Sequence, residues 1–100
     1  MLYDGLDSLA PSLVARINRA IAVLHVRGAA AALDALDDLA ADPRIAAYQP
    51  YWAARAHVLA LSGRTNDATI CYDRAIALES DEAVKEFLKQ KLQSLINASI

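Results

Sequence analysis

Apolar residues recur three and four positions apart along most of this 100-residue chain, the spacing that places them on one face of a helix. In the stretch from residue 11 to 27 this apolar stripe consists of Leu13, Val14, Ile17, Ile21 and Leu24. No stretch sustains the alternation of apolar and polar residues that is typical of a strand. The pattern therefore predicts a protein built from helices alone.

Turn-forming residues divide the chain into five helices. We expect these helices over residues 11–27, 29–41, 50–61, 66–79 and 81–97. A short piece before them, residues 2–9, is similar to the end of another helix. The helices would form a single domain, 1–100, with one hairpin over 11–41, a second over 50–79 and a capping helix over 81–97.

Several residues are candidates for the helix ends. Pro11 is expected as a first helical residue, a position that tolerates proline. Asn66 and Ser80 are expected as N-caps, because their side chains can accept a hydrogen bond from a free backbone N–H. Gly28 should form the first turn, and Asp42 should end the second helix because a residue before proline is disfavoured in helical geometry.

The stripes also predict which side chains face inward. The expected core positions of the second helix are Ala32, Leu33, Leu36 and Leu39, and those of the last helix are Val84, Phe87, Leu88, Leu92, Leu95 and Ile96. Asp34, Asp37 and Asp38 lie opposite the first set, which predicts a solvated face. The helix at 11–27 is apolar on too many sides for an outer wall. We therefore expect an exposed apolar patch on it, covered by preceding segments of a longer protein, and a dimer when the chain is isolated.

The two hairpins repeat each other. Four pairs of positions are separated by 36 residues: Ala20 and Ala56, Ala32 and Ala68, Leu36 and Tyr72, and Leu39 and Ala75. A helix-turn-helix period of about 34 residues is the signature of the tetratricopeptide repeat. The second hairpin carries the clearer motif, with Trp52, Ala56, Leu59, Gly63, Ala68, Tyr72 and Ala75 at its positions. The expected fold is all-α, with antiparallel hairpins stacked as a short right-handed superhelix, and the alternative is an unrelated alanine-rich bundle.

Composition and charge exclude several classes of protein. Hydrophobic residues make up 56% of the chain but aromatic residues only 6%, so the apolar bulk is mostly aliphatic and favours helices. The formal net charge of −2 and the scattered basic residues argue against direct binding to nucleic acid. The chain has one cysteine, no secretory signal at its start and no apolar run long enough to cross a bilayer. These features favour a cytoplasmic location and no membrane contact.

The sequence carries no motif of a catalytic site. It contains no glycine-rich phosphate loop, nucleophile elbow or metal-ligand spacing, so we expect no enzyme activity, no cofactor and no metal. His25 and His57 could meet between the repeats, but two histidines without a third ligand make a poor zinc site. Cys71 is expected as a small buried apolar residue.

Binding to another protein fits the pattern better. In tetratricopeptide arrays the first helix of each hairpin lines a concave groove. The candidate partner-binding residues at those positions are Val14, Ile17, Asn18, Ile21, His25, Ala53 and His57, with Pro50, Ala54 and Ala60 beside them. Such a mostly apolar groove suits a helix or a neighbouring domain. Tyr48, Tyr51 and Trp52 form an aromatic cluster in which Trp52 is expected to be core and, as the alternative, a binding hot spot.

The sequence also resembles one family beyond the repeat motif. The stretches that carry the resemblance are LYDGLDSLAPS, INRAIAV, LAADPRIAAY, AARA at 53–56, SGRTNDA, YDRAIAL and AVKEFLKQKL, between residues 2 and 92. They are similar to the C-terminal tetratricopeptide-like extension of extracytoplasmic-function sigma factors. The resemblance implies a regulatory role in transcription initiation, with RNA polymerase, the sigma core regions or another regulator as partner. The DNA-reading sigma regions are not in this chain, and the alternative function is a stand-alone adaptor that binds a peptide or helix of an unrelated partner.

Overall fold

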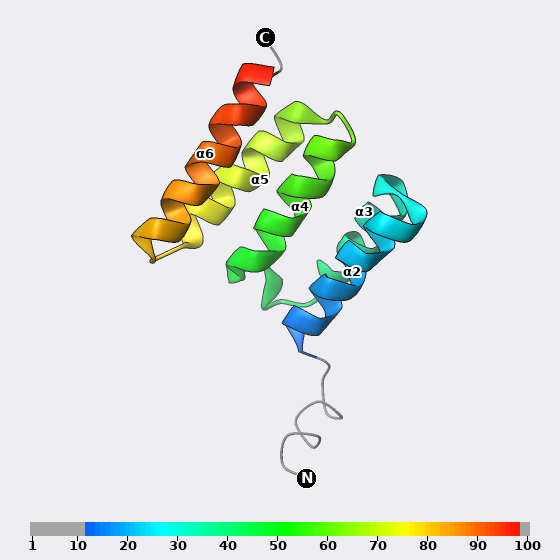
Figure 1. Cartoon of the computed structure of the whole chain (residues 1–100). Helices are drawn as coiled ribbons and strands as arrows, with labels where there is room; N and C mark the ends of the chain where they lie inside the picture. Colours follow the sequence, from blue (N-terminus) through cyan, green and yellow to red (C-terminus); the bar gives the residue numbers. More distant parts are fainter. Residues whose placement is uncertain (1–11, 99–100) are drawn as a thin grey trace.

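A computed structural model describes residues 12–98, and over this range the chain consists of helices with no strand (Figure 1). The elements are α2 (Leu13–Arg27), α3 (Ala29–Leu39), the 3-10 turn η1 (Ile45–Ala47), α4 (Gln49–Leu61), α5 (Thr65–Leu78) and α6 (Glu82–Ala98). The expectation of an all-helical protein is confirmed for this range. The expected helical piece at residues 2–9 lies outside the described residues.

The first two helices are joined by a single residue, Gly28. Its φ of 94° and ψ of 176° lie in a region of backbone geometry that is almost closed to other residues. The N–H of Gly28 donates to the carbonyl of Leu24 at 3.1 Å, and the N–H of Ala32 donates to the carbonyl of Gly28 at 3.2 Å. The glycine thus belongs to the hydrogen-bond ladders of both helices, and α3 packs on α2.

Several helix ends differ from the expected ones. Helix α2 begins at Leu13, where the Oγ of Ser12 accepts from the N–H of Ala15 at 3.0 Å. Pro11, expected as the first helical residue, lies outside the described residues.

The two predicted N-caps are wrong. Helix α5 begins at Thr65, so Asn66 lies within its first turn and caps nothing. In α6 the cap is Asp81 instead of Ser80: the Oδ1 of Asp81 accepts from the N–H of Ala83 at 2.8 Å and of Val84 at 3.4 Å. A carboxylate is a strong acceptor near the positive end of a helix, and Ser80 instead donates its own N–H to Glu79.

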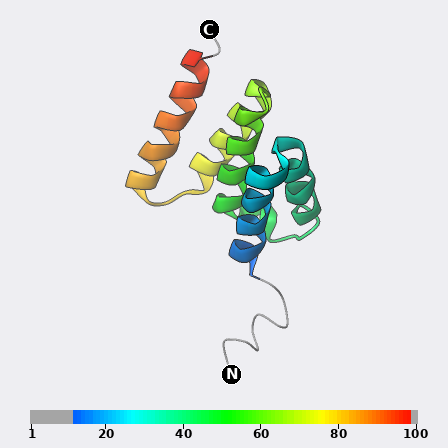
Figure 2. The same cartoon turned by 45° about the vertical axis from the view of Figure 1, so that its right-hand side comes forward.

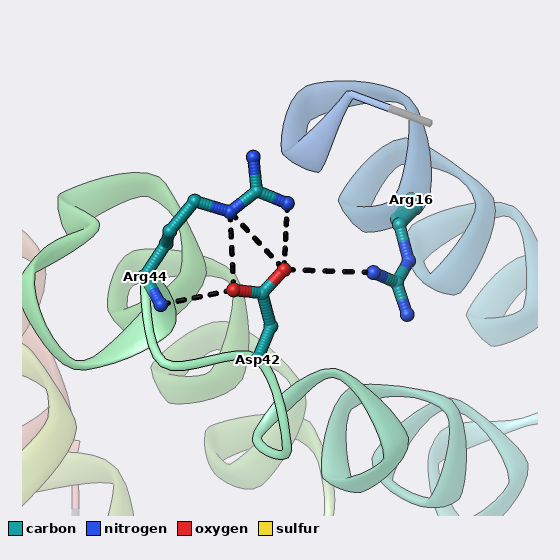
Figure 3. A network of polar contacts seen from close by, with 3 residues as sticks. All are labelled: Arg16, Asp42 and Arg44. Atoms are coloured by element: carbon teal, nitrogen blue, oxygen red, sulfur yellow. Dashed lines mark hydrogen bonds and ion pairs between the residues drawn. The ribbon is translucent and has the colours of Figure 1, made fainter. Parts of the chain in front are cut away.

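The loop after α3 is held by one carboxylate (Figure 3). Helix α3 ends at Leu39, two residues earlier than expected, and Asp42 then bonds Arg44 through the backbone N–H at 2.9 Å and the guanidinium at 2.6 Å. Arg16 of α2 approaches the same carboxylate at 3.8 Å. The hydrogen bond from the Arg44 side chain is the main cause that lowers the pKa of Asp42 to about 2. The charged carboxylate therefore ties this loop to α2.

Each helix packs on its neighbour in sequence, and α4 also packs on α2. Helix α4 consequently lies at the centre, with α2 and α3 on one side and α5 and α6 on the other (Figure 1). In the turned view α6 stands beyond α5 and away from α3 (Figure 2). The two most extensive interfaces, α4 with α5 and α2 with α3, join helices that are consecutive in the chain.

Five of the helical alanines are deeply buried in the core. Ala20, Ala32, Ala56, Ala68 and Ala75 are each no more than 1% exposed. A methyl side chain lets two helix axes approach closely, and larger side chains then fill the space beside the contact. The larger buried side chains are Leu13, Ile17, Leu33, Leu36, Leu39, Ile45, Tyr51, Val58, Leu59, Cys71, Tyr72 and Leu88.

The predicted inward positions of α3 are all buried, whereas the stripe of α6 is only partly inward. Leu88 is buried, and Val84, Leu92 and Leu95 pack against the core. Phe87 is 57% exposed and Ile96 is 38% exposed, so the expectation that both belong to the core is wrong. Because α6 packs chiefly on α5, only one narrow side of it is covered.

Helix α2 keeps apolar side chains on its surface, with Val14 52% and Val26 83% exposed. The two side chains are 12 residues apart along the helix, so the expected apolar patch on it stays a prediction. None of the helices between residues 12 and 98 combines the length and the apolar content needed to span a bilayer.

Candidate interaction groove

A groove of about 350 Å³ opens between α2, α4 and α6. Its lining consists of Ile17, Asn18 and Ile21 of α2, Ala53, Ala54 and His57 of α4, Tyr72 of α5, and Phe87, Leu88 and Lys91 of α6. We call this set the groove. Most of its lining is apolar, and the polar groups lie among apolar neighbours from three helices.

The groove exists because α2 and α6 flank α4 while small side chains lie between them. Ala53 and Ala54 sit on the face of α4 that looks toward both neighbours, and neither is long enough to fill the space. On α2, Ile17 and Ile21 are one turn apart, and on α6 Phe87 and Lys91 are one turn apart. Side chains of α2 and α6, mostly apolar apart from Asn18 and Lys91, therefore border a floor of alanine.

Lys91 gives the groove its positive charge. The Nζ of Lys91 lies 5.6 Å from the centroid of the Phe87 ring, a cation–π distance. Burial lowers the pKa of His57, and the positive charges of Lys91 and His25 lower it further. Because the usual pKa of histidine is 6.5, His57 is neutral at pH 7. Among the described residues that line the groove, none is acidic.

The structure brings five of the seven candidate partner-binding residues into the groove: Ile17, Asn18, Ile21, Ala53 and His57. Val14 and His25 do not line it. Both belong to α2 and are exposed, Val14 one turn before Ile17 and His25 one turn after Ile21. Pro50 and Ala60, which were also expected to line the groove, are absent from its lining.

Sequence reasoning missed the contribution of α5 and α6. Tyr72 was expected in the motif core, and it is 5% exposed while still reaching the groove. Phe87 and Leu88 were assigned to the core together, although only Leu88 is buried. Lys91 had no signal in the sequence beyond its spacing of four residues from Phe87.

Trp52 of the aromatic cluster lines a second hollow, together with Ile70, Asp73 and Arg74, and this hollow is separate from the groove. Tyr51 is buried at 2% exposure and meets Trp52 edge to face, with ring centroids 5.1 Å apart. Trp52 is half-buried, donates its Nε1–H to the carbonyl of Ala46 at 3.2 Å and lies 5.0 Å beneath the guanidinium of Arg74. Tyr51 is thus the core residue of the pair. Trp52, which was expected to be core, packs against the core but is only partly buried.

Asp37 and Cys71, two other residues with reactive or charged side chains, have structural environments that explain them. Asp37, expected on a solvated face, accepts a 2.7 Å hydrogen bond from Arg55, whose side chain is 22% exposed. Cys71 is 5% exposed, and burial raises the pKa of its thiol. Within residues 12–98 no three His, Cys, Asp or Glu side chains come close enough together to hold a metal ion.

Comparison with known proteins finds a relative in Rhizobium meliloti (strain 1021). This protein, described only as uncharacterized, is 35% identical to the chain over 95 residues. The alignment covers 95% of the chain but 22% of the relative, so the chain spans about a fifth of the relative's length. No family model matches the chain, and no solved structure matches it.

Proposed function

We propose that this chain is a protein–protein interaction domain of the tetratricopeptide type and that it serves as the regulatory C-terminal extension of an extracytoplasmic-function sigma factor. The observation that carries the binding role is the groove, which presents apolar walls and an alanine floor from three helices without a filling side chain. Apolar grooves between helices are common docking sites for helices of other proteins.

Burial at equivalent positions supports the repeat. The four residue pairs separated by 36 positions, Ala20 and Ala56, Ala32 and Ala68, Leu36 and Tyr72, and Leu39 and Ala75, are buried at all eight positions. Burial at every one of these positions is the result expected if the two helix pairs pack in the same way. The turns also match, since Gly28 and Gly63 both have positive φ, 94° and 78°.

The sigma-factor role rests on the resemblance in sequence, and the relative is compatible with it. In that relative, sequence of this kind is one part of a chain more than four times as long. An accessory domain that docks on other regions of the same protein or on a larger assembly would have this arrangement. RNA polymerase and the two conserved sigma regions are therefore the partners to test first.

The decisive experiment is a pull-down of the purified chain with three baits: core RNA polymerase, the two conserved sigma regions and whole lysate. The groove variant Ala53→Arg fills the floor, and the matched control Ala77→Arg places the same side chain on an exposed position of α5. We expect one transcription bait to retain the wild type and Ala77→Arg but to lose Ala53→Arg. Retention of an unrelated protein with neither transcription bait binding would refute the sigma role and leave the stand-alone adaptor.

A further inference from the structure

The groove has a charge opposite to that of the whole chain. The chain carries a formal net charge of −2, yet the charged side chain in the lining of the groove is that of Lys91, next to His57 and Tyr72, which are neutral at pH 7. The described lining residues include no carboxylate that could neutralise Lys91. A partner that brings a negative charge would therefore be favoured over one that brings a positive charge.

The shape of the groove indicates that the partner is a helix. Its two walls each present side chains one helical turn apart, Ile17 with Ile21 and Phe87 with Lys91. Side chains at this spacing on an incoming helix would meet both walls in register. The methyl groups of Ala53 and Ala54 let the backbone of such a helix come close to α4.

We propose that the groove binds an amphipathic helix with an acidic side chain at the edge of its apolar face. Its apolar side chains pack on Ile17, Ile21 and Phe87, and its carboxylate lies against Lys91 and His57. This inference rests on the proposed binding function of the groove and specifies the chemistry of the partner.

Protonation of His57 should strengthen this binding. The charged and titratable groups near His57 are His25 on α2, Tyr72 on α5 and Lys91 on α6. Burial and the positive charge of Lys91 lower the pKa of His57, and a bound carboxylate would offset both effects. Binding would then take up a proton, so affinity should increase as the pH is lowered from about 7.5 to about 5.5, where Asp and Glu stay ionised.

The test uses three fluorescent synthetic helices that share one leucine stripe and differ only in carrying Glu, Gln or Lys beside it. Fluorescence anisotropy should show that the Glu peptide binds roughly fivefold more tightly than the Gln peptide, with the Lys peptide weakest. Lys91→Glu should reverse this order. Lys89→Glu makes the same change of charge at an exposed position of α6 outside the groove and should preserve the order. Circular dichroism checks that both variants are folded.

Four outcomes would overturn the inference: no binding of any peptide, equal affinity for the three peptides, preference for the Lys peptide, or the same effect from Lys89→Glu as from Lys91→Glu. Concentration-dependent dimerisation that Ala53→Arg abolishes would also overturn it, because the occupant would then be a second copy of the chain.

Failure of the acidic-helix inference can be told apart from failure of the sigma role. If a transcription bait loses Ala53→Arg while the peptides show no preference, only the acidic-helix inference fails. If the acidic peptide binds and no transcription bait does, only the sigma role fails.

Discussion

Replacing Leu36 with alanine should remove a large part of the stability of this domain. Leu36 is 0% exposed and belongs to the central cluster of buried residues. Loss of three side-chain carbons removes about 2.4 kcal/mol of transfer free energy at about 0.8 kcal/mol per carbon. The cavity left in a packed interior brings measured values for such changes to about 2.7–5 kcal/mol. We therefore expect Leu36→Ala to lower the free energy of unfolding by about 3.5 kcal/mol.

A loss of this size is a large fraction of the total, since a domain of this length has a free energy of unfolding of about 5–15 kcal/mol. Urea unfolding followed by far-ultraviolet circular dichroism would give the free energy. A thermal scan should show a melting temperature lower by roughly 14–28 °C. The matched control is Leu61→Ala in α4, because Leu61 is 60% exposed and its truncation should cost less than about 1 kcal/mol. The reasoning fails if Leu36→Ala costs less than about 1 kcal/mol or if the two variants lose equal stability.

Three further predictions concern a turn, a carboxylate and a thiol. Gly28→Ala should lower the free energy of unfolding, measured in urea, by roughly 1–3 kcal/mol. The cost comes from the positive φ at this turn and not from a steric clash, since no atom lies within 4 Å of the added Cβ. An unchanged free energy of unfolding would contradict this backbone geometry. Asp42 has a folded pKa of about 2 against its usual 3.8, so its contribution is full above about pH 4 and is lost as the pH falls toward 2. The difference in stability between the wild type and Asp42→Asn should therefore be constant from about pH 5 to 7 and shrink below about pH 4, whereas a constant difference down to pH 2 would exclude this linkage. Cys71 should react with a thiol reagent far more slowly in the native protein than in urea, and equal rates would show that it is not buried.

The existence and order of the helices could be predicted because two strong local signals agree. The apolar period identifies each helix, and Gly28, Asp42 and Gly63 interrupt that period where the chain turns. Local signals were weaker at the helix starts. Ser80 and Asp81 are adjacent, and both residue types can cap a helix. Which of them caps α6 depends on the hydrogen bond between the Ser80 N–H and Glu79, which the sequence pattern does not reveal.

The groove could be predicted where it depends on the repeat and could not where it depends on the orientation of α6. Ile17, Ile21 and His57 follow from the position of each helix within its hairpin. Phe87 and Leu88 are neighbours on an apolar stripe, and the period cannot decide which of them faces α5. The rotation of α6 about its own axis is set by tertiary packing on α5, which buries Leu88 and leaves Phe87 at the rim of the groove.

The packing of each helix on its sequence neighbour has a consequence for how the chain reaches its native state. Contacts that are short in sequence close small loops, so little chain entropy is lost before they form. Proteins dominated by such contacts fold in microseconds to milliseconds. Local opening should then begin at the ends of the array, and first at α6, because Leu88 is the one residue of this helix that is buried. Its amide protons should exchange with solvent before those of α4, which neighbours cover on both sides.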